Sequence, residues 1–334
     1  MTPPVRGNGS ARDACDLSVV IVSWNVRELL RQCVRAVLDT RSGLDAEIIV
    51  VDNAGSDGSV EMIRREFPDV RIVALAKNIG FAAGNNRGIA LSRGRHVLAL
   101  NPDVIVGPGA LATMVAKLDR DAAVGALGAR QLDERGRVRR AGRTLPTFAA
   151  MLGQYTLLRV VPYFRDALDR YKMRTFGWDR EHCVEVLGGG TLMTRRSVLE
   201  QLGGWDERFF MFFEDVDLCH RIRRAGYRTV FLPDAEVVHY GGRSARQAPG
   251  REMMVLRSMF AYFDKHAERG RTFLFRCVFK PAYLVTVLLR LPVESLAALG
   301  QLLAGRRNRA RRRLRVVRRI LRFCTRDVWS LLDL

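Results

Sequence analysis

Short apolar runs alternate with amphipathic segments from residue 17 to residue 133. The apolar runs cover residues 17–24, 47–52, 70–76, 96–100 and 123–129. The segments with apolar residues at helical spacing are 26–39, 59–67, 81–92 and 108–120. Strands that alternate with helices are typical of βα units around a mostly parallel sheet. The pattern therefore predicts a doubly wound α/β domain, and the 48% hydrophobic content allows it to bury a core.

Four residues stand at the expected ends of these strands: Trp24, Asp52, Asn101 and Asp103. In doubly wound sheets, ligands bind outside the carboxyl ends of the strands. Core packing explains one such residue more easily than four, so the set predicts a ligand site. The Asp52 carboxylate only accepts hydrogen bonds and matches the single ring N–H of uracil or thymine. A turn-forming Asp52 and a Trp24 in the core are the structural alternatives.

Two acidic motifs carry the expected chemistry. Asp103 follows an apolar run, and Glu214, Asp215 and Asp217 follow the run Phe209–Phe213. A strand-end carboxylate suits a divalent cation on a diphosphate, because hard cations take oxygen ligands and keep positions open for phosphate. An acid pair beside apolar side chains has the surroundings of a general base. Together they indicate a nucleotide-sugar transferase, with turn or helix capping as the structural alternative.

Several motifs follow one another in a recognisable order. They are Ser18–Asn25, Val50–Ser59, Asn78–Asn86, Leu100–Asp103, Gly203–Asp206 with Phe213–Asp217, and His239–Ser244. Each motif alone is weak, but the ordered set resembles glycosyltransferase family two, which has the GT-A fold. The resemblance covers roughly residues 17–245. Within the family, the chain is most similar to the rhamnosyltransferase-like branch.

The resemblance implies a set of donor-binding residues. Asp52 and Asn53 take the positions that read the nucleoside, although many relatives have a second Asp where this chain has Asn53. Trp24 is expected to stack on the base. Asn101 replaces the first acid of the D-x-D metal motif and is expected to bond to the ribose or the metal. Asn85 is a candidate nucleotide contact, and helix capping is its simpler interpretation.

The resemblance also implies roles at the reaction centre. Asp103 is expected to bind a divalent cation, Mg²⁺ or Mn²⁺. His239 is expected to face the diphosphate or the metal, with a structural histidine as the alternative, and Arg243 to contact a phosphate. Asp215 is the expected base, and Glu214 is expected to orient the acceptor. A single base without a second nucleophile implies inversion at the anomeric carbon.

The C-terminal tail, residues 251–334, carries most of the excess charge. Residues 265–334 hold 17 Lys and Arg against 4 Asp and Glu, in a chain of net charge +20. Charges interrupt the apolar segment 273–304, whose charge-free stretches are shorter than the ~20 residues of a spanning helix. An apolar stripe among the ten arginines of 306–322 predicts a basic amphipathic helix. We therefore expect an interfacial or re-entrant apolar pair, followed by a helix on an anionic membrane surface. Nucleic acid is the less favoured partner.

The chain is expected to divide into a disordered lead-in (1–16), a GT-A domain (17–250) and the tail. The GT-A domain has a nucleotide-sugar half (17–133) and an acceptor half (134–250). Residues 134–182 form either an acceptor-binding excursion or a surface helix pair, and 184–194 form a strand with three central glycines. Six scattered cysteines without metal-ligand spacing fit a reducing cytosol.

The sequence thus predicts an inverting, metal-dependent GT-A glycosyltransferase on the cytosolic face of a membrane. It would move a sugar, rhamnose from dTDP-rhamnose, onto a lipid-linked or cell-envelope glycan. The alternative is a non-catalytic GT-A-like scaffold that binds membrane or nucleic acid through its basic surface. Asn101 in the metal motif supports this alternative, and Asp103, Glu214 and Asp215 oppose it.

Overall fold

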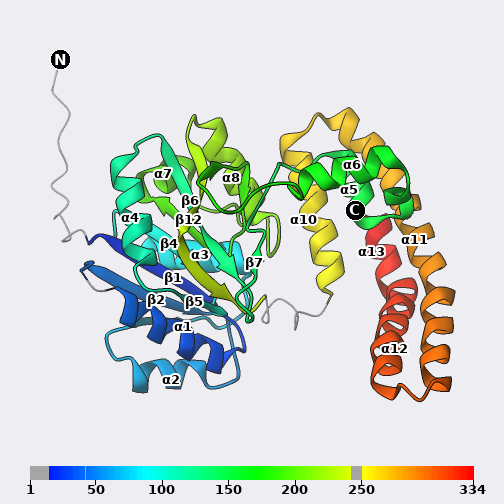
Figure 1. The fold of residues 1–334 in the computed structure, drawn as a ribbon, viewed down its shortest axis with the longest axis horizontal. Coiled ribbons are helices and arrows are strands. Elements are labelled where there is room, and N and C mark those ends of the chain that lie inside the picture. The colour runs from blue at the N-terminus through cyan, green and yellow to red at the C-terminus, as the bar shows by residue number, and fades with distance from the viewer. Residues whose placement is uncertain (1–14, 42, 242–249) are drawn as a thin grey trace. The chain divides into compact units, whose positions relative to one another are not determined.

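The computed structural model describes residues 15–41, 43–241 and 250–334 (Figure 1). Most of the predicted lead-in, and Arg243 with the rest of 242–249, lie outside the described residues. The chain forms two compact units. The first unit contains Met1–Gly142, Gly177–Phe210 and Glu214–Ala248, and the second contains Arg143–Phe176, Met211–Phe213 and Pro249–Leu334.

A ten-stranded sheet forms the centre of the first unit. Its main path is β3-β2-β1-β4-β11-β6-β12-β5, with β7 paired to β6 and β9 to β12, while β8 and β10 form a separate pair. The strands are β1 (Leu17–Ser23), β2 (Ala46–Asp52), β3 (Arg71–Ala74), β4 (His96–Leu100), β5 (Val104–Val106), β6 (Val124–Leu132), β7 (Val138–Arg139), β8 (Gly142–Arg143), β9 (His182–Cys183), β10 (Val186–Leu187), β11 (Thr191–Arg195) and β12 (Arg228–His239). The neighbours β3-β2-β1-β4 are parallel, β12 is parallel to β6, and β11 runs antiparallel to β4 and β6. The predicted α/β sheet is confirmed.

Helices cover both faces of this sheet. Those of the first unit are α1 (Arg27–Thr40), α2 (Ser59–Glu66), α3 (Phe81–Leu91), α4 (Ala110–Arg120), α7 (Arg196–Leu202) and α8 (Glu214–Arg224). Successive side chains of a strand point to opposite faces. Leu17, Val19 and Ile21 of β1 accordingly join the core under α1, α2 and α4, and Val22 packs on the other face with Phe81 of α3.

Two glycines let α3 lie unusually close to β1. A Cβ added at Gly88 would come within 2.3 Å of Val20 Cγ1, and one added at Gly84 within 2.9 Å of Val22 Cγ1. These glycines are four residues apart and therefore share one helix face. The resulting close contact fixes the start of α3 beside the ends of β1 and β2.

Two expected element boundaries were wrong. The helix expected from Pro108 begins at Ala110, because Gly109 adopts a left-handed conformation with φ of 73° just before it. The single strand expected over 184–194 is broken into β10 and β11, and Gly188–Gly190 form the turn between them. The glycines therefore lie in a turn at the end of the strands, just before β11, rather than inside a strand.

The second unit is helical. Its elements are α5 (Phe148–Tyr155), η1 (Leu157–Val160), α6 (Pro162–Tyr171), α10 (Arg251–His266), α11 (Arg269–Leu303), α12 (Arg307–Arg322), η2 (Phe323–Asp327, a π-helical turn) and α13 (Val328–Leu332). Aromatic rings from α5, α10 and α11 form its core. The Phe148 ring lies 4.6 Å from that of Phe263 and 4.7 Å from that of Phe275, measured between centroids.

The apolar part of the tail is one helix rather than the expected pair. α11 runs unbroken through Pro281 and Pro292, and the helical hairpin forms between α11 and α12. A proline inside a helix removes one backbone hydrogen bond and bends the helix without necessarily ending it. By length and composition, α11 is able to cross a membrane, with a mean hydropathy of 1.6 over 18 residues. The charge-free stretches are as short as expected, but the helix that contains them is long enough to span a membrane by length and composition.

Candidate active site

The predicted strand-end residues meet at one edge of the sheet. Ser23 of β1 is level with Asp52 of β2, and Ile21 of β1 is level with Leu100 of β4. Because these strands are parallel neighbours, Trp24, Asp52 and Asn101 all leave the sheet on its carboxyl side. β12 adds His239 to this edge, opposite Val104.

Four buried polar atoms at this edge have no hydrogen-bond partner among the described residues. They are Ser23 Oγ, Asp52 Oδ1, Thr191 Oγ1 and His239 Nε2. Nearly all buried polar groups in native proteins are hydrogen-bonded, and an unpaired one costs about 1–3 kcal/mol. Four such atoms at one edge therefore indicate a polar ligand that supplies the missing partners.

Asp52 has one carboxylate oxygen in use and one available. Its side chain is 2% exposed, and Oδ2 accepts a hydrogen bond from the Gly55 backbone N–H at 2.8 Å. Burial raises the pKa of the Asp52 carboxyl above its usual range. Protonation would convert Oδ1 from an acceptor to a donor, so any N–H donor bound there is expected to bind more weakly as the pH falls through that raised pKa. Trp24 is half-buried. It is therefore not a core residue, which was the structural alternative to a base-stacking role.

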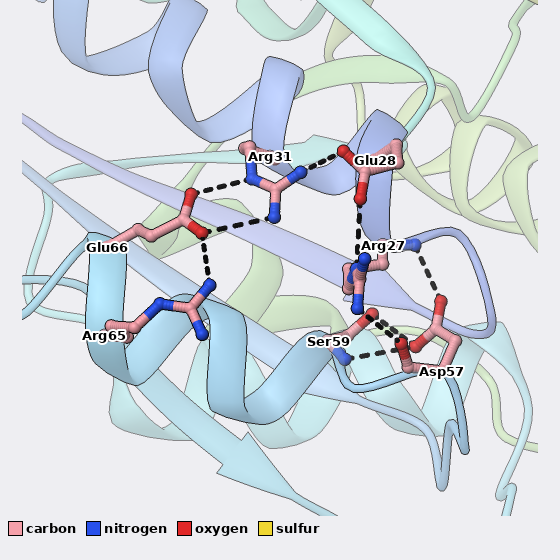
Figure 2. A network of polar contacts seen from close by, with 7 residues as sticks. All are labelled: Arg27, Glu28, Arg31, Asp57, Ser59, Arg65 and Glu66. Atoms are coloured by element: carbon pink, nitrogen blue, oxygen red, sulfur yellow. Dashed lines mark hydrogen bonds and ion pairs between the residues drawn. The ribbon is translucent and has the colours of Figure 1, made fainter.

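The loop after β2 is held by a polar network with α1 and α2 (Figure 2). The Asp57 carboxylate accepts hydrogen bonds from the Arg27 backbone N–H at 2.7 Å and from the Ser59 hydroxyl at 2.6 Å. Arg31 of α1 bonds to Glu66 of α2 at 2.7 Å. Hydrogen bonds from these arginines, Arg31 and then Arg65, lower the pKa of Glu66 to about 2. The network ties the loop that follows Asp52 to α1 and α2.

Two predicted nucleotide contacts have their side chains engaged within the fold. Asn53 Nδ2 donates to the Gly80 carbonyl at 3.0 Å, and its Oδ1 accepts from the Ile79 N–H at 2.8 Å. Asn85 Nδ2 donates to the Phe81 carbonyl at 2.9 Å. Both residues are buried. Their observed contacts position the loop before α3, and direct contact with a nucleotide stays a prediction.

Asp103 and His239 face each other at the carboxyl edge. His239 Nε2 lies 3.4 Å from Asp103 Oδ1, and His239 Nδ1 lies 3.0 Å from Gln131 Oε1. Because an amide oxygen only accepts, Gln131 holds the proton on Nδ1 and turns the Nε2 lone pair towards Asp103. Burial, and then the nearby charge of Asp103, raises the pKa of the Cys33 thiol. A proton or a cation is needed between two facing acceptors.

Asp103 and His239 could bind a divalent cation whose other ligands are substrate phosphates and water. No group of three or more His, Cys, Asp and Glu side chains able to hold a metal occurs in the described part of the chain. Mg²⁺ is commonly held by one or two carboxylates plus substrate phosphates and water. Asp103 and His239 suit this arrangement, with Gln131 orienting the imidazole as an outer partner does in metal sites. Asn101 is half-buried beside them.

Asp215 stands in the first turn of α8. Its Oδ2 accepts a hydrogen bond from the Gly189 N–H at 3.0 Å, and its Oδ1 accepts one from the Val216 N–H at 2.8 Å. These two backbone hydrogen bonds fix the orientation of the carboxylate. Glu214 precedes it and is also buried. Asp217, in the same first turn of α8, pairs with Arg221 at 2.7 Å.

The glycine turn links the two acidic motifs. A Cβ at Gly189 would lie 3.3 Å from Asp215 Cβ, and one at Gly190 would lie 2.9 Å from His239 Cε1 and 3.3 Å from Asn101 Nδ2. Consecutive residues of one turn therefore contact the expected base and the expected metal site. The small size of glycine permits both approaches.

Sequence reasoning missed several residues of this edge. Ser23 and Thr191 carry unpaired hydroxyl groups, Gln131 orients His239, and Gly189 and Gly190 join the two halves of the site. The only sequence signals were the position of Ser23 inside a motif and the glycine run before Thr191. Arg243 lies outside the described residues.

The chain is similar in sequence to known glycosyltransferases. Residues 14–256 match the family model described as "Glycosyltransferase like family 2". The chain is 30% identical over 255 residues to N-acetylglucosaminyl-diphospho-decaprenol L-rhamnosyltransferase of Mycobacterium tuberculosis, covering 71% of this chain and 80% of that protein. It is 25% identical over 184 residues to rhamnosyltransferase WbbL of Escherichia coli, covering 50% and 63% of the two chains.

A solved structure shows the same fold. The mannosyltransferase PcManGT of Pyrobaculum calidifontis, in complex with GDP-Man and Mn²⁺, aligns with a TM-score of 0.55 at 18% identity. The alignment covers 96% of this chain and 89% of that one. The fold and the edge site define a glycosyltransferase of the GT-A fold. The chain belongs to glycosyltransferase family 2 and is a rhamnosyltransferase-like member of it.

Proposed function

We propose that this enzyme transfers rhamnose from dTDP-rhamnose to a lipid-linked or cell-envelope glycan, with inversion at the anomeric carbon. The row of unpaired buried polar atoms at the carboxyl edge carries the proposal. Asp52 Oδ1 meets the ring N–H of thymine, and Trp24 stacks on the base. The choice of rhamnose as the donor sugar rests on two relatives that are named as rhamnosyltransferases.

Asp103 and His239 hold a divalent cation together with the donor diphosphate. When bound, Mg²⁺ or Mn²⁺ stabilises the negative charge that gathers on the leaving diphosphate. Asn101 bonds to the ribose or the cation. Glu214 orients the acceptor, whose hydroxyl gives its proton to Asp215 as its oxygen attacks the anomeric carbon from the face opposite the diphosphate. A single attack without a covalent sugar-enzyme intermediate inverts the configuration.

Donor hydrolysis and transfer provide the direct test. Purified enzyme with Mn²⁺ is expected to hydrolyse dTDP-rhamnose slowly and to transfer rhamnose to a synthetic prenyl-diphosphate-linked sugar. The same assay with UDP- and GDP-sugars identifies the nucleobase and the sugar of the preferred donor. If the enzyme neither binds nor turns over any nucleotide sugar, the non-catalytic scaffold is the correct alternative.

The second unit is proposed to bind the inner surface of the cell membrane. The charges that interrupt α11 in the sequence have partners within this unit: Arg276 pairs with Asp264 at 2.6 Å, and Lys280 donates to the Leu332 carbonyl at 2.7 Å. Glu294 pairs with Arg313 of α12 at 2.7 Å. Among the exposed positions of 273–303, only Arg290 is charged. The outward face of α11 is therefore almost wholly apolar.

α12 supplies the opposite chemistry. All ten arginines of 306–322 are exposed, and Arg313 alone forms an ion pair within the described chain. Basic side chains near an anionic membrane contribute about 1 kcal/mol each. An apolar helix face and an unpaired arginine helix in one unit suit a bilayer, which takes up apolar side chains and has anionic headgroups. Nucleic acid offers no place for the apolar face.

Charges on the outward face of α11 are expected to release the protein from membranes. Leu289 and Leu296 are 53% and 69% exposed, so replacing both by glutamate leaves the folded unit intact. The double variant should lose most of its flotation with anionic vesicles, while donor hydrolysis stays unchanged. Val160→Glu, at a side chain 74% exposed in η1, is the matched control and should float like the wild type.

The salt dependence of vesicle binding separates the contribution of the α12 arginines from that of the apolar face of α11. Binding of the wild type should weaken as salt rises, because exposed charges are screened over ~8 Å at physiological ionic strength. Equal binding to neutral and anionic vesicles would contradict the role of the arginines. Salt-sensitive binding to RNA, with none to vesicles, would assign α12 to nucleic acid.

A further inference from the structure

Arg139, in the short hairpin strand β7, lies beside the proposed catalytic centre. β7 pairs with β6, and Arg139 stands directly opposite Gln131, the residue that holds His239. Its guanidinium lies against Gly241, two residues after His239. A Cβ at Gly241 would come within 2.7 Å of Arg139 Nη1 and 3.0 Å of Nη2. Gly241 is held close to Asp103, since the Tyr240 N–H donates to the Asp103 carbonyl at 2.9 Å.

The Arg139 guanidinium has no ion-pair partner within the described ranges, although it is half-buried. Its neighbours in the hairpin are different. Arg137 pairs with Asp133 at 2.7 Å, and Arg130 pairs with Glu236 at 3.3 Å. A half-buried cation without a counter-charge is costly, and a bound anion relieves that cost. The position indicates an anion that belongs to the reaction.

We infer that Arg139 binds the diphosphate of the nucleotide-sugar donor. The inference rests on the proposed function. Guanidinium groups match phosphate oxygens with two parallel hydrogen bonds and remain charged at any physiological pH. Asn101 adds no carboxylate beside Asp103, and no group of three His, Cys, Asp or Glu ligands occurs among the described residues, so the cation has few charged protein ligands. A fixed positive charge at Arg139 gives the leaving diphosphate a second source of stabilisation.

Binding of thymidine, dTMP and dTDP to the full-length enzyme, measured by calorimetry with Mn²⁺, tests the inference. Arg139→Gln should weaken dTDP binding by about 10- to 100-fold, as expected for loss of a hydrogen bond to a charged group. Thymidine binding should stay unchanged. The dTDP affinity of Arg139→Lys should lie between those of the wild type and Arg139→Gln, since lysine keeps the charge but loses the paired hydrogen bonds of the planar guanidinium group. Arg137→Gln, in the same hairpin, should bind all three like the wild type.

Each other outcome has a defined meaning. If the wild type binds dTDP and Arg139→Gln binds it equally well, Arg139 does not contact the diphosphate and the inference fails alone. Equal losses of thymidine and dTDP affinity in Arg139→Gln would show that the substitution disturbs the fold, and would also overturn the inference. Unchanged dTDP binding with a raised KM for the acceptor would assign Arg139 to the acceptor instead. If the wild type binds neither dTDP nor UDP nor GDP, the proposed function fails and the inference falls with it.

Discussion

Turnover is expected to fall about 100-fold or more when Asp215 is replaced by asparagine, the usual scale for loss of a positioned base. The amide keeps the shape of the carboxylate and loses the proton acceptor. Binding of dTDP should be unchanged, because the donor contacts assigned to Asp52, Asp103 and His239 do not involve Asp215. Single-turnover transfer and calorimetry measure the two quantities separately.

The contacts of Asp215 set the controls. Both of its oxygens accept backbone N–H groups, from Gly189 and Val216. An amide nitrogen in place of one oxygen cannot accept, so some loss of thermal stability is expected and should be measured. Glu214→Gln is the matched control and should reduce transfer less while changing the KM for the acceptor. Wild-type turnover of Asp215→Asn at neutral pH would show that the base lies elsewhere.

The first half of the fold was predictable because local patterns determine it. Apolar runs followed by amphipathic segments define β1, α1 and their successors within a few residues. Parallel neighbours end at a shared edge, so strand-end residues such as Asp52 and Asn101 had to converge. Neither statement needs knowledge of distant contacts.

The second half of the site depends on a tertiary choice that no local pattern shows. β11 enters antiparallel between β4 and β6, and this insertion brings Gly189 to Asp215 and Gly190 to His239. The sequence shows three glycines but not what they approach. The role of Gln131 likewise follows from β6 lying beside β12.

Polar atoms and charges were the hardest features to place. Asn53 stands in a motif that was predicted to bind the nucleotide, yet both ends of its amide bond to the backbone. In α11, Lys280 and Glu294 interrupt the apolar sequence but find partners on the inner side of the helix. A linear sequence shows that a charge is present, and only packing shows which way it points.

Removing the Asp103 carboxylate is expected to abolish the effect of divalent cations on donor binding. In the wild type, Mn²⁺ should tighten dTDP binding, because Asp103 and His239 would hold the cation beside the diphosphate. In Asp103→Ala, dTDP should bind equally weakly with and without Mn²⁺, and transfer should be lost, since no third His, Cys, Asp or Glu among the described residues completes a metal-binding group here. Asn101→Asp is the opposing control, because it adds a carboxylate and should tighten Mn²⁺ binding.

The distance between Asp103 and His239 makes this experiment decisive. At 3.4 Å, the two acceptors need either a proton or a cation between them. With a proton, the pair is a buried salt bridge, and removing one partner of such a pair is strongly destabilising, by about 3–5 kcal/mol. Mn²⁺ would then leave dTDP binding unchanged even in the wild type. With a cation, Mn²⁺ stabilises the wild type against thermal unfolding, and Asp103→Ala loses that stabilisation together with the cation-dependent part of donor affinity.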